Sequence, residues 1–114
     1  MKEYPEHLAE IRQGMAALGG EIPGTMAAFM GLHKAAASDG ALSAKVKELL
    51  ALAIAVTVRC DGCIAFHVHD ALKAGATREE LVEALGVAIL MGGGPAVIYA
   101  TEALNAVDQF EAEL

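Results

Sequence analysis

Helix-breaking residues divide this chain of 114 residues into helix-length segments. Between the breaks, apolar residues recur at helical spacing, and no segment shows the alternation expected of a strand. The breaks fall at Gly19-Gly20, Asp39-Gly40, Gly75 and Gly92-Gly93-Gly94-Pro95. The sequence therefore predicts an all-α fold, in which about six helices form a compact bundle.

Capping signals refine these boundaries. Ser43 is a good N-cap, and Thr77 with Glu80 forms the pattern of a capping box. Pro23 and Pro95 suit a first helical turn. The predicted helices cover about residues 5–18, 23–39, 44–58, 60–75, 79–91 and 95–110. No linker or low-complexity segment interrupts them, so we expect a single domain over residues 1–114.

The composition is unusually apolar for so short a chain. Hydrophobic residues make up 55% of it and aromatic residues only 4%, so the excess comes from aliphatic side chains and alanine. A small domain cannot bury that much apolar surface by itself. We therefore expect a homo-oligomer whose interfaces bury the remainder. Met15, Met26, Met30 and Met91 are predicted to fill the core.

The charge pattern limits the partners. A net charge of −7 argues against nucleic-acid binding, which requires a basic surface. The longest apolar run, residues 49–58, is far shorter than the roughly 20 residues that span a bilayer. The first residues contain no apolar signal segment. We therefore predict a soluble cytoplasmic protein without a membrane or nucleic-acid partner.

The strongest functional signal is Glu48 followed by Cys60-Asp61-Gly62-Cys63 and His67. Helix residues at i, i+3 and i+7 share a face, so both cysteines and the histidine are expected to line one side of a helix. Thiols two residues apart can close a disulfide, and an imidazole one turn away can take a proton. In a reducing cytosol such a pair is more often catalytic or metal-binding than structural.

The spacing also suggests roles. His67 lies four residues after Cys63 but seven after Cys60, so we assign Cys63 as the attacking thiol and Cys60 as the resolving thiol. Glu48, on the preceding helix, would orient His67 and stabilise its charged form. In the predicted cycle a peroxide oxidises Cys63 to sulfenic acid, Cys60 closes the disulfide, and a dithiol donor reduces it. We expect no cofactor.

Other chemistries remain open at this point. Cys60, Cys63 and His67 also supply three zinc ligands, as in a zinc-stabilised helical binding module. Covalent haem attachment is excluded because Ile64, rather than histidine, follows the second cysteine. Taken alone, Glu48 would be a surface partner of Lys45 or Lys47. The remaining histidines are predicted to be ordinary surface or hydrogen-bonded residues: His7, His33 and His69.

The spacing Glu48-x11-Cys60-x2-Cys63-x3-His67 resembles the signature of the AhpD-like alkylhydroperoxidases, within the carboxymuconolactone decarboxylase superfamily. The likeness covers about residues 22–106 and includes the flanking Gly92-Gly93-Gly94-Pro95-Ala96. It implies an all-α fold, cofactor-free peroxidase or disulfide reductase activity, and assembly into trimers or hexamers. Lipoyl-bearing, thioredoxin-like or peroxiredoxin-type proteins are the reductants that it implies.

Carried over by position, the resemblance makes Cys63 the peroxidatic thiol, Cys60 its partner, and His67 with Glu48 the proton relay. Some peroxidase members place an additional relay histidine between the cysteines, where this chain has Asp61-Gly62. That departure bears on the peroxidase rate more than on the redox class. The decarboxylase branch lacks the cysteine pair, which makes a lactone-handling enzyme the weaker alternative.

Overall fold

The computed structural model describes residues 2–113, which form six helices and contain no strand. The helices are α1 (Tyr4–Glu21), α2 (Pro23–Ala37), α3 (Ala44–Thr57), α4 (Asp61–Lys73), α5 (Arg78–Gly92) and α6 (Gly94–Glu111). The predicted all-α fold is confirmed. Met1 and Leu114, which belong to the predicted domain of residues 1–114, lie outside the described residues.

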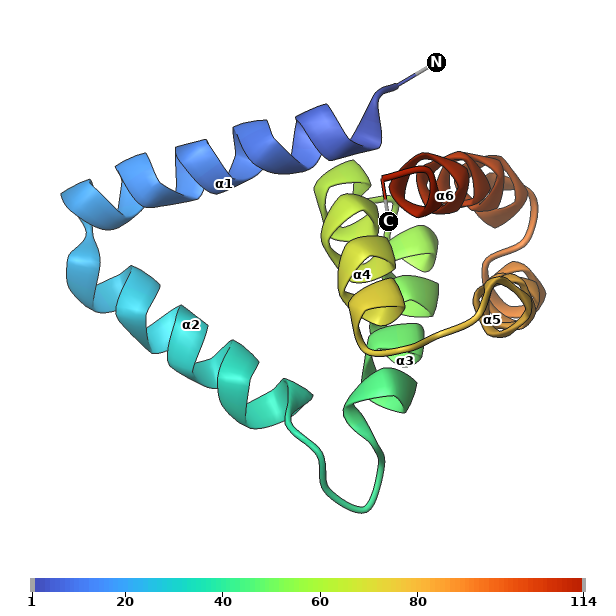
Figure 1. Ribbon diagram of the computed structural model, residues 1–114, viewed down its shortest axis with the longest axis horizontal. Coiled ribbons are helices and arrows are strands. Elements are labelled where there is room, and N and C mark those ends of the chain that lie inside the picture. Colours follow the sequence, from blue (N-terminus) through green and yellow to red (C-terminus); the bar gives the residue numbers. More distant parts are fainter. Residues whose placement is uncertain (1, 114) are drawn as a thin grey trace.

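The helices form a four-helix body and an arm (Figure 1). Helices α3 and α4 pack together at the centre, and α5 and α6 cover one side of them. The start of α1 contacts α4 and α6, after which α1 and α2 run away from the body as the arm. The core contains buried side chains from α3 to α6, together with Tyr4 and Leu8 of α1. Among the described residues, α2 has no buried side chain.

The predicted caps have the expected geometry. Ser43 accepts a hydrogen bond from the backbone N–H of Val46 at the start of α3. Thr77 and Glu80 form the complete capping box of α5, with each side chain accepting from the other residue's backbone. Local sequence therefore supplies the caps that begin α3 and α5.

The predicted end of α1 is wrong by a few residues. Glycines at 19 and 20 were expected to stop the helix, but it continues to Glu21. Glycine costs a helix only about 1 kcal/mol per residue, which neighbouring turns can offset. The helix ends because Pro23 disfavours helical backbone at Ile22, whose φ and ψ are −131° and 65°.

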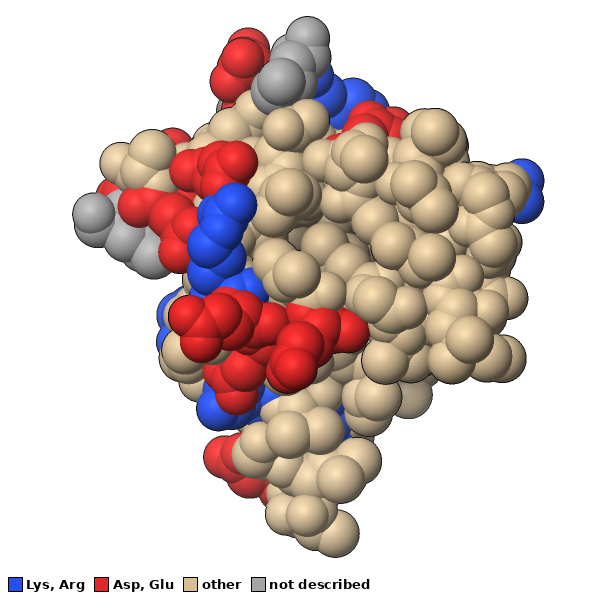
Figure 2. All heavy atoms as spheres, turned by 90° about the vertical axis from the view of Figure 1, so that its right-hand side faces the viewer, with Lys and Arg blue, Asp and Glu red and all other residues tan. Residues whose placement is uncertain are grey.

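Many apolar side chains remain exposed, and this corrects part of the predicted core. Met30 is 50% exposed and Met91 77% exposed, so these two methionines do not fill the core of one chain. Figure 2 shows the α5 and α6 side, where a belt of charged residues borders a broad area without them. Leu90 and Ile98 are exposed on these helices. Within residues 2–113, no helix has the length and apolarity needed to cross a membrane.

Candidate active site

The turn between α3 and α4 positions the cysteine pair. Val58 is the C-cap of α3, and Arg59 follows in the left-handed conformation, with φ of 61°. The N–H of Arg59 donates to the carbonyl of Val56, and that of Cys60 donates to the carbonyl of Ala55. This is the Schellman pattern of a helix C-terminus. It reverses the chain within two residues and makes Cys60 the N-cap of α4.

The two cysteines form a disulfide, and their Cα atoms lie 5.2 Å apart. The Sγ of Cys60 also accepts a hydrogen bond from the backbone N–H of Cys63 at 3.2 Å. Both sulfurs therefore lie at the N-terminus of α4, where the helix dipole stabilises negative charge on a thiolate. The sequence places a redox-capable pair here, and the structure shows its oxidised form.

Glu48 and His67 meet across the α3–α4 interface. The Nδ1 of His67 lies 3.0 Å from Oε1 of Glu48, whose side chain is only 8% exposed. A carboxylate can only accept hydrogen bonds, so Nδ1 carries the proton and Nε2 remains available as a base. The surface role considered for Glu48 is wrong: Lys45 pairs with Glu80 instead.

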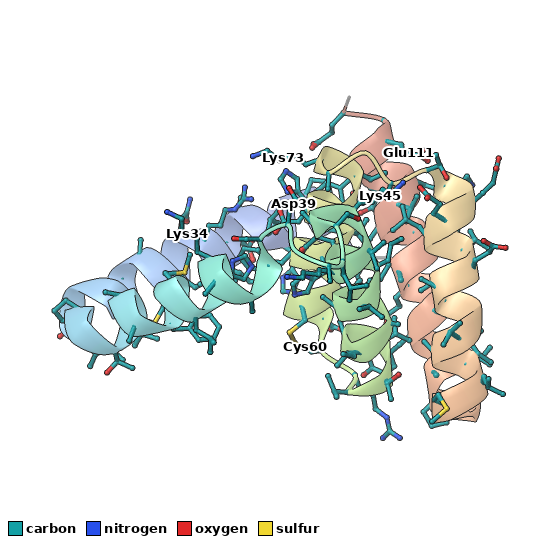
Figure 3. All side chains as sticks on the ribbon, turned by 90° about the horizontal axis from the view of Figure 1, so that it is seen from below. Lys34, Asp39, Lys45, Cys60, Lys73 and Glu111 are labelled. Carbon is teal, nitrogen blue, oxygen red and sulfur yellow. A yellow bond between two sulfur atoms is a disulfide. The ribbon has the colours of Figure 1, made fainter. Side chains whose placement is uncertain are left out.

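A cavity of about 880 Å³ lies between the arm and α4. Both cysteines and His67 line it, and Figure 3 shows Cys60 at the end of α4 on the side of the arm. The opposite wall is mostly apolar and includes Met15, Met26, Phe29 and Met30. Cys60, Cys63 and His67 thus share one accessible hollow large enough for an organic molecule, whereas Glu48 does not line it.

Two charged residues of this cavity were not singled out from the sequence. Arg12 lines the cavity with its guanidinium 5.7 Å from the ring centre of Phe66. Asp70 lines it three residues after His67, and its Oδ1 lies 2.9 Å from Nδ1 of His69. The i, i+3 spacing from His67 was the available signal for Asp70, whereas nothing in the sequence linked Arg12 to α4.

Gly62, between the cysteines, lies against α1. A Cβ atom at this position would be 2.9 Å from Cδ1 of Ile11, closer than real side chains approach. A side chain at this position would therefore require the end of the Ile11 side chain to shift. Gly62 thus lets the start of α4 approach Ile11 of α1 closely.

Asp61 follows Cys60 and belongs to a polar cluster at the beginning of α1. Its Oδ2 pairs with Nζ of Lys2, while Oδ1 is buried without a hydrogen-bond partner among the described residues. Burial, with the nearby charges of Glu102 and Asp61, raises the pKa of Tyr4 well above its ordinary value of 10. The Tyr4 hydroxyl donates to Glu102 at 3.3 Å.

With this geometry established, comparison with known proteins identifies the family. The family model for the carboxymuconolactone decarboxylase family matches residues 23–106. The chain belongs to the carboxymuconolactone decarboxylase family. This match confirms, at the level of the family, the resemblance that the sequence motif indicated.

Similar proteins cover most of the chain. An uncharacterised protein of Cupriavidus necator is 50% identical over 105 residues, which is 92% of this chain and 93% of that protein. A protein encoded in the cox locus of Paracoccus denitrificans is 40% identical over 84 residues, 74% of this chain and 76% of that protein. These relatives support the family assignment and carry no named activity.

Solved structures confirm the fold. A carboxymuconolactone decarboxylase family protein from Legionella pneumophila has a TM-score of 0.93 and 45% identity, covering 96% of this chain and 98% of that one. A family protein from Thermotoga maritima, described with a possible role in an antioxidative response, has a TM-score of 0.84 and 27% identity. That match covers 93% of this chain and 91% of the other.

Proposed function

We propose that this protein is a thiol-dependent peroxidase, which reduces hydrogen peroxide or organic hydroperoxides through Cys60 and Cys63. The observation that carries the proposal is that His67, which is hydrogen-bonded to the buried Glu48, lines the same cavity as the cysteine pair. The antioxidative role ascribed to the Thermotoga maritima relative is in keeping with it.

The cycle uses the chain's own groups. Nε2 of His67 takes the proton of the Cys63 thiol, and the thiolate attacks the terminal oxygen of the peroxide. The O–O bond breaks, Cys63 becomes a sulfenic acid, and the alkoxide or hydroxide leaves with the proton from His67. The Cys60 thiol then displaces water from the sulfenic acid and forms the disulfide. An external dithiol reduces it and is itself oxidised to a disulfide.

Glu48 acts through His67. Its buried carboxylate fixes the ring orientation and the tautomer, and it stabilises the imidazolium that forms while His67 holds the thiol proton. The proposed reductant is a dithiol of the lipoyl-bearing or thioredoxin-like kind, in the cytoplasm, and the apolar cavity wall suits a lipoyl chain as well as an organic hydroperoxide.

Single cysteine variants test the cycle. With tert-butyl hydroperoxide in a stopped-flow assay, Cys63→Ser should consume no peroxide, whereas Cys60→Ser should consume one equivalent and then stop. The sulfenic acid left on the Cys60→Ser variant should react with dimedone. The opposite pattern would make Cys60 the attacking thiol. The hydrogen bond that its Sγ accepts from the backbone N–H of Cys63 would then stabilise the Cys60 thiolate. Wild-type activity in both variants would refute the proposal.

The two alternatives predict different results. In the oxidised form both sulfurs are joined to each other, so the zinc module with Cys60, Cys63 and His67 as ligands requires the reduced protein. Stoichiometric zinc on the reduced protein, without peroxide consumption, would support that module. Lactone turnover by the double Cys→Ser variant would support a lactone-handling enzyme.

We further propose that the chain assembles with copies of itself into a trimer or hexamer. Helix α2 has no buried side chain within one chain, and its Phe29 and Leu32 are 52% and 64% exposed. Exposed apolar surface on this scale marks association sites. Light scattering coupled to size-exclusion chromatography should give three or six times the 11.8 kDa chain mass. A monomer at micromolar concentration would refute this part.

A further inference from the structure

A second cluster of polar groups overlaps the relay. Three side chains each offer one potential ligand atom here, and these atoms lie within 4.8 Å of one another: Glu48, His67 and Asp70. Zinc bonds to carboxylate oxygen and imidazole nitrogen are about 2.0–2.2 Å long, so two ligand atoms of one ion lie at most about 4.4 Å apart. Three atoms 4.8 Å apart lie about 2.8 Å from their common centre, so side-chain movements of less than about 1 Å would bring all three onto one ion.

The position of the cluster suits a cation that enters from solvent. Glu48 is buried, whereas the side chains of His67 and Asp70 are 22% and 27% exposed and line the cavity. Two carboxyl side chains and an imidazole supply the oxygen and nitrogen ligands that zinc binds. His69 contacts one oxygen of Asp70 and leaves the other available, which is how outer groups commonly orient a metal-binding carboxylate.

We propose that Glu48, His67 and Asp70 form a binding site for a divalent cation, Zn²⁺, and that its occupation switches off the thiol cycle. The ion would bind Glu48 and one ring nitrogen of His67, and the ring's other nitrogen would then carry the proton, so His67 could no longer take a proton from Cys63. Binding at the site stands by itself, whereas the inhibition rests on the proposed peroxidase function.

Reduction of the disulfide should strengthen the site. Cys63, His67 and Asp70 lie at positions i, i+4 and i+7 of α4 and share one face of it. A thiolate released at Cys63 can therefore join the three ligands, and thiolate is a ligand that zinc favours. This set differs from the Cys60–Cys63–His67 module, because it includes Glu48 and Asp70 and does not require both thiols.

The oxidised protein isolates the three-residue site, since its sulfurs are held in the disulfide. Zn²⁺ is titrated into oxidised wild type, Asp70→Asn and Glu83→Gln in competition with a chromogenic zinc indicator. Glu83 is an exposed carboxylate on α5, so its variant makes the same change of charge outside the cavity. We expect one ion per wild-type chain, at least tenfold weaker binding by Asp70→Asn, and unchanged binding by Glu83→Gln.

Absence of stoichiometric binding to oxidised wild type, or equal affinities of wild type and Asp70→Asn, would overturn the site. Thermal unfolding of the same samples shows whether Asp70→Asn is folded, and zinc should raise the melting temperature of wild type more than that of the variant. Should Asp70→Asn fail to fold, Asp70→Ser, which also removes the carboxylate, replaces it and should show the same tenfold loss of affinity. A folded Asp70→Ser protein that binds zinc as tightly as wild type would overturn the site.

The inhibition is measured on reduced protein in a zinc-buffered peroxide assay. Wild-type peroxide consumption should fall at least tenfold at saturating zinc, and Asp70→Asn should require at least tenfold more zinc for the same loss. Equal sensitivity of the two proteins would show that zinc acts on the thiols alone and would overturn the switch. A wild type that consumes no peroxide without zinc would refute the proposed function and the switch with it, while the binding result on oxidised protein would stand.

Discussion

Replacement of Glu48 by glutamine is the sharpest test of the relay. Glutamine keeps the size of the side chain but replaces the charge that accepts from Nδ1 of His67 at 3.0 Å. A hydrogen bond to a charged group contributes about 1.5–3 kcal/mol. Because each 1.36 kcal/mol changes a rate tenfold, Glu48→Gln should lower kcat/KM for hydroperoxide by about 10- to 150-fold.

The expected loss should depend on His67, through which Glu48 acts. Stopped-flow rates for Glu48→Gln, His67→Gln and the double variant form a double-mutant cycle, in which the double variant should be little slower than His67→Gln alone. Glu83→Gln is the matched carboxylate control and should keep the wild-type rate. A Glu48→Gln rate within twofold of wild type, or fully additive losses, would refute the reasoning.

Three further predictions concern the surroundings of the site. Arg59 and Gly75 both have positive φ, which glycine adopts without strain. In urea unfolding, Arg59→Gly should therefore raise the free energy of unfolding by about 0.5–1 kcal/mol, and Gly75→Ala should lower it by about 1 kcal/mol. Changes of the same sign in the two variants would contradict this reasoning. Gly62→His should destabilise the protein by about 1–3 kcal/mol in the same assay, and adding Ile11→Ala should restore part of the lost stability. An unchanged urea midpoint for Gly62→His alone would show that Ile11 does not restrict this position. Because the pKa of Tyr4 is raised in the folded state, its contribution to stability is complete below pH 10 and is lost as the pH rises further. Tyr4→Phe should therefore lose less stability than wild type at alkaline pH. An equally steep loss in the variant would show that Tyr4 does not cause it.

The helices and their boundaries follow largely from local sequence. Ser43 and the Thr77–Glu80 capping box act within one turn of the chain, so their geometry could be predicted without a fold. The end of α1 was mispredicted because two glycines only weaken a helix, whereas the backbone restriction before Pro23 ends it. Met30 and Met91 were mispredicted because hydropathy does not distinguish a core from an exposed apolar surface.

For the candidate site, sequence spacing alone determined that Cys63 and His67 share a face of one helix, because helical geometry is periodic. Only the tertiary structure decided that Glu48 is buried against His67, that Asp70 joins them, and that α1 and α2 enclose a cavity in front of the cysteines. These relations depend on how separate helices pack, and packing distances between residues far apart in the chain leave no periodic signal in one sequence.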